Sequence, residues 1–179
     1  MNKNKTPLII ILAILLIMLF LCTDTEAATT KRYVTKTVKL SKDLTVKANT
    51  KVTLVKSGTK CTVSYKGGKY KIHKKHLSTL RAVKKYTGRY FKRAGGIRWK
   101  GYKYTWYSQR TLPGHGLKIP GRHLDSQGFV CDKDGYIVVG SNVANKRKRV
   151  IVATPFGKFG KCYDCGYVGP KHFDCYTAW

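Results

Sequence analysis

The chain ends in Cys162-Tyr-Asp-Cys-Gly-Tyr-Val-Gly-Pro-Lys-His-Phe-Asp-Cys-Tyr-Thr-Ala-Trp179, and this stretch decides the predicted fold of the C-terminal half. It contains two aspartates, Asp164 and Asp174, each among small and aromatic residues that are typical of strands. A Gly-Pro pair at 169–170 separates them and indicates a turn. The sequence therefore predicts two neighbouring strands that each carry a carboxylate. Such a pair can serve acid catalysis, or it can only hold backbone N–H groups in turns.

The charge of the chain is strongly positive, with 36 Lys and Arg against 8 Asp and Glu and a formal net charge of +28. Removal of residues 1–27 would take away two lysines and two acids, so the charge would stay at +28. The acids left would all be aspartates, namely Asp43, Asp125, Asp132, Asp134, Asp164 and Asp174. A positive field attracts polyanions over a Debye length of about 8 Å at physiological salt. Nucleic acid, anionic wall polymers and lipid surfaces are candidate partners, and a merely solvated basic surface is the alternative.

The N-terminus has the pattern of an export signal. Lys3 and Lys5 precede an unbroken apolar run of fifteen residues, Leu8 to Cys22. This run is shorter than the roughly 20 residues that span a membrane, and it suits the apolar region of a signal peptide. Small residues at Thr25 and Ala27 suit a cleavage site after Ala27. We expect a signal peptide over 1–27 and a secreted or wall-associated protein, whereas an uncleaved segment would be a membrane anchor.

Residues 32–78 show the apolar alternation of short β-strands. Val52, Leu54, Val63 and Ile72 recur at period two, and turn residues such as Gly67-Gly68 separate the runs. The segments Asn49-Thr-Lys-Val-Thr-Leu54 and Val63-Ser-Tyr-Lys-Gly-Gly-Lys-Tyr-Lys-Ile-His-Lys-Lys-His-Leu77 resemble bacterial Src-homology-3-like domains. The resemblance implies a small barrel over 32–78 that binds cell-wall material.

Residues 79–100 have the composition of a linker. Ser78 is a candidate cap for a short helix with Leu80 and Val83 on one side, and glycines at 88, 95 and 96 argue against a long one. The remaining residues, 101–179, alternate again in several short runs with turns every 8–12 residues, which favours a sandwich or a small barrel. The predicted fold class is therefore mainly β throughout.

The second half resembles the double-psi β-barrel of three-aspartate domains and membrane-bound lytic transglycosylases. The resemblance rests on Thr105-Trp-Tyr107, on Tyr163-Asp-Cys-Gly166 and on His172-Phe-Asp-Cys-Tyr176. It implies a six-stranded barrel over 101–179. Gly140-Ser141 stands where the family places a first aspartate.

The same resemblance implies an activity and a site. A lytic transglycosylase cleaves the peptidoglycan glycan without water, because the muramyl 6-hydroxyl attacks its own C1 and forms a 1,6-anhydro sugar. The resemblance assigns Asp174 as the acid/base and Asp164 as its helper. The substrate-binding candidates are Thr105, Tyr107, His115 and Tyr176. A general acid needs a raised pKa, which burial and the like charge of Asp164 favour and the positive field opposes.

Three functions therefore stay open. The first is a cell-wall glycan-cleaving enzyme whose partners are peptidoglycan and anionic wall polymers. The second is a non-catalytic cationic wall-binding protein, and the third is an extracellular nucleic-acid binder. Digestion of wall sacculi distinguishes the first from the others.

The cysteines allow a further interpretation. Cys162 and Cys165 form a Cys-x-x-Cys pair that, with Cys131 and Cys175, offers four thiolates to zinc. With Cys61, five cysteines follow residue 27, so at least one is free or paired between chains. We expect packing thiols or one or two disulfides instead of a metal, and no cofactor.

Overall fold

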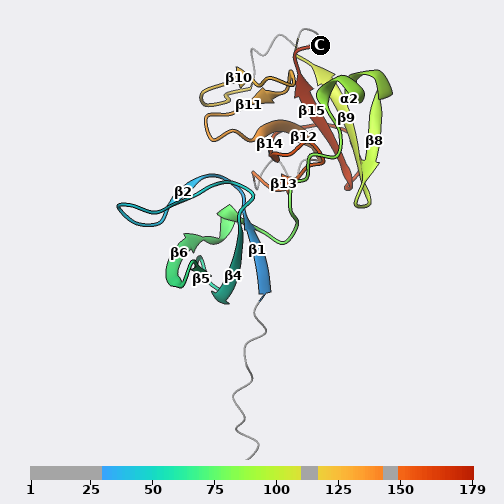
Figure 1. Cartoon of the computed structure of the whole chain (residues 1–179). Coiled ribbons are helices and arrows are strands. Elements are labelled where there is room, and N and C mark those ends of the chain that lie inside the picture. The colour runs from blue at the N-terminus through green and yellow to red at the C-terminus, as the bar shows by residue number, and fades with distance from the viewer. Residues whose placement is uncertain (1–29, 110–116, 143–148) are drawn as a thin grey trace, which may run out of the picture.

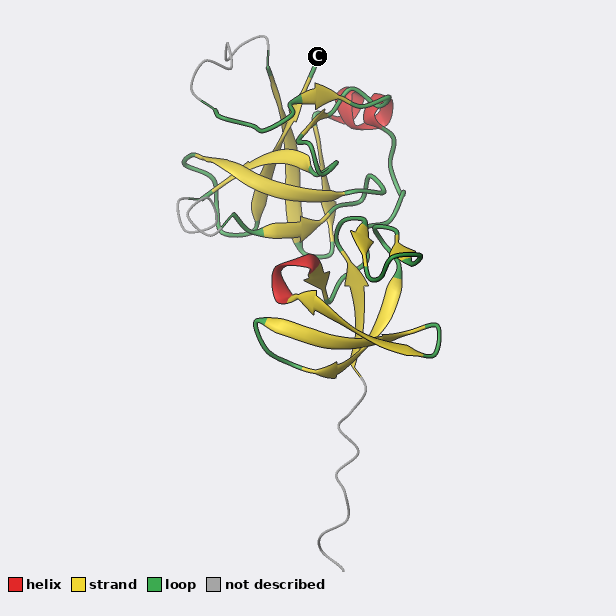
Figure 2. Ribbon diagram, turned by 90° about the vertical axis from the view of Figure 1, so that its left-hand side faces the viewer, coloured by secondary structure: helices red, strands yellow, loops and turns green. Residues whose placement is uncertain are grey.

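The computed structural model describes residues 30–109, 117–142 and 149–179, and these residues form a mainly β protein, as predicted. Figures 1 and 2 show two units, with the N-terminal unit beneath the C-terminal one and the C-terminus on the far side of the latter. Within the described ranges no helix is long and apolar enough to cross a membrane. The predicted signal peptide at 1–27 lies outside these ranges.

The N-terminal unit is an antiparallel sheet in which β6, β5, β4, β1 and β7 pair in this order. Its core consists of inward-facing aliphatic side chains, because the period-two alternation points them to one face. These residues are Val34, Val46, Val52, Val63 and Ile72. The strands are β1 Thr30–Val34, β2 Val38–Lys39, β3 Thr45–Val46, β4 Lys51–Lys56, β5 Lys60–Tyr65, β6 Gly68–His73 and β7 Leu77–Ser78, and a 3₁₀ helix covers Lys74–His76.

The hairpin between β5 and β6 shows why the glycine pair marked a turn. Lys66 and Gly67 connect the strands with φ angles of 46° and 77°. Positive φ at both central positions is what a two-residue type I′ turn requires, and glycine adopts it without steric cost. The turn fixes the register, in which Val63 faces Tyr70.

The helix lies later in the chain than the sequence suggested. Helix α2 runs over Gly88–Ala94, and the Thr87 hydroxyl caps it by accepting a hydrogen bond from the backbone N–H of Tyr90. It ends at Gly95, whose φ is 67°. The expected cap at Ser78 is wrong, because the Ser78 hydroxyl instead bonds the backbone of Leu80.

The C-terminal unit is a mixed sheet in which β13, β14, β12, β15, β9 and β8 follow one another, and β10 and β11 extend from the start of β12. Two of the pairs are parallel, β12 with β14 and β9 with β15. The strands are β8 Gly96–Trp99, β9 Tyr102–Ser108, β10 His123–Leu124, β11 Val130–Cys131, β12 Ile137–Ser141, β13 Ile151–Ala153, β14 Phe159–Cys165 and β15 His172–Thr177.

The segment 79–100 is not a free linker. Strand β8 pairs with β9, and Ala82 and Phe91 lie in the core of the C-terminal unit. The segment therefore belongs to that unit.

Strand β12 is the centre of the C-terminal unit. All of its residues are buried, since one face packs on an aromatic core and the other on a smaller cluster around Val138 and Tyr163. Core contacts include Phe91 against Phe156 and Phe129 against Phe156, with ring centroids 4.7 Å apart in each pair. A strand held on both faces gives a rigid base to whatever site it borders.

Specific hydrogen bonds join the two units. The Thr35 hydroxyl lies 2.7 Å from the Tyr136 hydroxyl, and Lys36 Nζ lies 3.1 Å from Asp134 Oδ1. The Asn49 side chain bonds backbone atoms of Ala82.

Candidate functional site

The site is built from one row of residues that crosses four strands. Asp164 of β14 pairs with Gly140 of β12, Gly140 pairs with Asp174 of β15, and Asp174 pairs with Thr105 of β9. A Cβ atom at Gly140 would lie 3.7 Å from Cβ of Asp174 and 3.8 Å from Cβ of Asp164. The glycine thus leaves open the space between the two carboxylates.

A cavity of about 140 Å³ opens at this row. It is smaller than the roughly 300 Å³ at which ordinary ligand pockets begin, so it suits one bond and its neighbouring groups instead of a whole oligosaccharide. Both aspartates line it. The other lining residues are Tyr107, Gly140, Ser141, Gly166, Val168 and Tyr176.

Asp174 is at the end of a short hydrogen-bond chain. The Thr105 hydroxyl donates to Asp174 Oδ1 and lies 2.6 Å from His172 Nε2. Because the single hydroxyl proton goes to the carboxylate, Nε2 of His172 must carry the proton that it shares with the Thr105 oxygen. His172 Nε2 also lies 3.5 Å from Asp174 Oδ1. The Thr105 hydroxyl is therefore the hydrogen-bond donor to Oδ1, with His172 close to the same oxygen, and Oδ2 is left as the oxygen that can carry a proton.

The surroundings of Asp174 favour its neutral form. Burial raises the pKa of this carboxyl group above its ordinary value, and the negative charge of Asp164 raises the pKa further. The positive charges of His172 and Lys103 oppose this shift. The net direction is upward, which is the direction that a general acid requires.

Asp164 is held by different partners. The Tyr176 hydroxyl donates to Asp164 Oδ2, and the backbone N–H of Cys165 donates to Oδ1 over 2.8 Å. Burial, followed by the Asp164 hydrogen bond, raises the pKa of Tyr176, so the phenol stays a proton donor. These two donors fix the orientation of the Asp164 side chain beside the cavity.

Three other aspartates have structural partners instead. Asp125 accepts hydrogen bonds from the backbone N–H groups of Gln127 and Phe129, and Asp132 accepts from the Tyr163 hydroxyl. Asp134 forms the ion pair with Lys36 at the junction. These turn and junction roles distinguish them from the cavity pair.

Most of the site residues predicted from the sequence lie at or beside this cavity. Asp164, Asp174, Tyr107 and Tyr176 line the cavity, and Thr105 contacts Asp174. His115 lies outside the described residues. Their proposed roles stay predictions.

The prediction from sequence missed His172, Ser141 and Gly140. His172 and Gly140 belong to the sequence segments quoted above. Their positions beside the two aspartates follow only from the pairing of strands that are far apart in the chain. The Ser141 hydroxyl donates to the backbone carbonyl of His172 over 3.3 Å and so ties β12 to the start of β15.

The cysteines pack as thiols. Cys131, Cys162 and Cys175 are fully buried, and burial raises the pKa of Cys131 to about 11 and that of Cys162 to about 12. All five cysteines of the described residues are free. Within the described part of the chain, no group of three His, Cys, Asp or Glu side chains converges in a way that would hold a metal ion.

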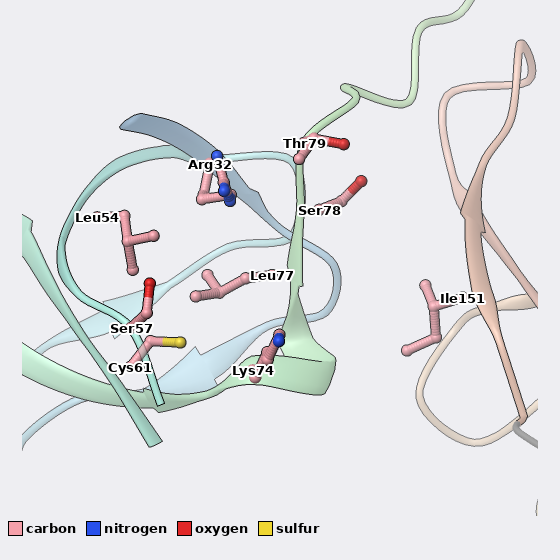
Figure 3. Close-up of a pocket in the computed structure, with 9 residues that line it drawn as sticks. All are labelled: Arg32, Leu54, Ser57, Cys61, Lys74, Leu77, Ser78, Thr79 and Ile151. Carbon is pink, nitrogen blue, oxygen red and sulfur yellow. The ribbon is translucent and has the colours of Figure 1, made fainter. Parts of the chain in front are cut away.

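A second hollow, of about 380 Å³, lies at the junction of the two units. Figure 3 shows Arg32, Lys74 and Leu77 of the N-terminal unit on one side and Ile151 of β13 across the opening. Its lining combines apolar and small polar side chains with two cations. Its lining shares no residue with the aspartate cavity.

Comparison of the chain with protein-family models, curated proteins and solved structures finds no match.

Proposed function

We propose that this protein is exported, lies at the cell wall and cleaves the glycan strands of peptidoglycan as a lytic transglycosylase. The observation that supports this most is the pair of aspartates on one cavity, with the pKa of Asp174 raised by burial and by Asp164. The two parallel strand pairs and the motifs quoted above support a double-psi barrel for the C-terminal unit. The antiparallel N-terminal sheet supports an Src-homology-3-like unit.

The proposed reaction begins with Asp174 as a carboxylic acid. It gives its proton to the glycosidic oxygen as the bond from that oxygen to C1 breaks. The 6-hydroxyl of the same muramyl residue attacks C1, and its proton passes to the Asp174 carboxylate. The acid is regenerated, and the product ends in a 1,6-anhydro sugar. Because the nucleophile is the sugar's own hydroxyl, no second carboxylate has to attack, in contrast to retaining hydrolases.

The contacts of Asp174 fit both halves of this cycle. The Thr105 hydroxyl donates to Oδ1 in either protonation state, so the proton is exchanged at Oδ2. After proton transfer, the Thr105 hydroxyl, which is itself hydrogen-bonded to His172, stabilises the carboxylate. Asp164 raises the pKa of Asp174 through its charge and leaves the proton transfer to its neighbour.

Digestion of purified sacculi followed by mass spectrometry tests this proposal. Muropeptides with anhydro ends are the expected product. Reducing ends would show a hydrolase instead. Binding to sacculi without any cleavage would overturn the proposal and favour the non-catalytic cationic wall-binding protein.

A further inference from the structure

A third hollow, of about 460 Å³, lies beside helix α2 and near the C-terminus. Its volume falls in the range of ordinary ligand pockets, which is roughly 300–1,000 Å³. It shares no lining residue with the aspartate cavity. Its walls consist of three cations, an indole and small polar residues, namely Lys84, Arg89, Lys92, Trp179, Thr87, Gly88, Ser126 and Gln127.

The three cations reach this hollow from two segments. Arg89 and Lys92 are three residues apart on α2 and therefore share one face of the helix. Lys84 comes from the segment that bridges Phe156. None of the three side chains forms an ion pair or a hydrogen bond with any residue that the structure describes. The hollow therefore combines three cations that the fold does not neutralise.

Of the three cations, only Arg89 opposes the helix dipole, because Lys92 lies in the last turn of α2 and Lys84 precedes the helix. The first turn of α2 has no acidic residue, and Arg89 stands where the helix dipole favours an anion. Like charges three residues apart also repel each other. A bound anion would offset both the unfavourable placement of Arg89 and the repulsion between Arg89 and Lys92.

The indole forms a fixed wall of the hollow. Trp179 packs on Gly128, where a Cβ atom would lie 2.5 Å from the ring, and its centroid lies 5.7 Å from that of Phe129. Trp106 holds it from another side, at 6.3 Å. A partly exposed indole in a fixed position offers an apolar surface for the C–H groups of a polyol or a sugar.

We propose that this hollow binds a phosphodiester-linked polyol, which is the repeating chemistry of an anionic wall polymer. Phosphates would lie at Lys84, Arg89 and Lys92, and the polyol would lie against Trp179. Nucleic-acid grooves stack successive bases on several aromatic side chains, whereas this lining has one indole. The choice of a wall polymer rests on the wall location proposed above, but the site does not depend on glycan cleavage.

Calorimetric titration of residues 28–179 with a glycerol phosphate oligomer of about six units tests the site. A triple variant changes Lys84, Arg89 and Lys92 to Gln, and a charge-matched control changes Lys100, Lys118 and Lys133, which are exposed in the same unit, to Gln. We expect the triple variant to bind the oligomer about tenfold or more weakly, with a smaller dependence of the affinity on salt. The control should lower the affinity about threefold at most. Lys92→Gln alone, at an exposed helix position, should already lower affinity by about threefold.

The indole N–H signal of Trp179 supplies a local readout, and it should shift on titration while that of Trp99 does not. If the triple variant and its control lose affinity equally, the oligomer binds through the overall positive charge of the protein and not at this hollow. Equal or tighter binding of a single-stranded DNA with the same number of phosphodiesters would overturn the polyol assignment. If the protein binds the oligomer at this hollow but does not cleave glycan, the binding site is supported and the proposed enzymatic activity is contradicted.

Discussion

Asp174 is balanced between neighbours that act on its proton in opposite directions. Burial and Asp164 raise its pKa, while Lys103 and His172 lower it. Asp164 lies two strands away, across Gly140, and Lys103 pairs with His172 at the start of β15. Each neighbour can be changed separately, so the proposed role of Asp174 can be tested through the pH dependence of the reaction.

Two single substitutions should move this pH dependence in opposite directions. The proposed reaction needs the protonated acid, so cleavage should fall as the pH rises through the pKa of Asp174. Asp164→Asn removes a like charge and should move this alkaline limb to lower pH. Lys103→Gln removes a positive charge at an exposed position and should move the limb to higher pH. The measurement is the rate of sacculus cleavage against pH, and shifts in the same direction would contradict the account.

Strand β12 places a glycine, Gly140, at the centre of the site. A methyl group at position 140 would meet the neighbouring side chains at 3.7–3.8 Å, which is ordinary van der Waals contact. Gly140→Ala should therefore fold normally but narrow the space between the carboxylates.

We expect Gly140→Ala to lower glycan cleavage by about ten- to a hundredfold, because a displacement of about 1 Å can cost that much. Thermal unfolding should change little. Gly169→Ala is the matched control, since its methyl group would meet no atom within 4 Å. A Gly140→Ala variant with full activity would show that the space above β12 is not used.

The sequence predicted most of the strands, because their apolar residues alternate with period two. The run from Tyr102 to Tyr107 corresponds to β9, and the run from Phe173 to Tyr176 corresponds to β15. The sequence did not predict β8 or the position of α2. Three glycines in that region disfavoured regular structure, whereas in the fold Gly95 ends the helix and Gly96 begins β8.

The candidate site was accessible from the sequence only through its motifs. The motifs named both aspartates, Thr105 and Tyr176, but not the hydrogen bond between Thr105 and His172. That contact depends on the parallel pairing of β9 with β15, which are separated by most of the C-terminal unit. Local patterns contain no information on such a pairing, and the register sets which side chains meet.

Asn49 joins the two units of the protein. It adopts a φ of 68°, and its side-chain amide donates to the carbonyls of Ala82 and Gly157 over 2.7 and 3.2 Å. Its Oδ1 accepts from the backbone N–H of Ala82 over 3.1 Å. Ala82 is buried, so that N–H would lose its partner without Asn49.

We expect Asn49→Ala to lower the free energy of unfolding by about 2–4 kcal/mol, through the lost hydrogen bonds and the positive φ. Asn49→Gly should cost about 1 kcal/mol less, because glycine tolerates that φ. Urea unfolding of both variants measures the difference. Unchanged stability in Asn49→Ala would show that these hydrogen bonds do not hold the units together.

We propose that Asp174 transfers the proton that cleaves the glycan, and one comparison on purified sacculi decides whether it does. Asp174→Asn is compared with Asp43→Asn, which makes the same change of charge at an exposed position of the N-terminal unit. The release of anhydro-muropeptides, followed by mass spectrometry, should fall about a hundredfold or more in Asp174→Asn and stay near the wild-type rate in Asp43→Asn. Undiminished release of anhydro ends by a folded Asp174→Asn protein would contradict the account.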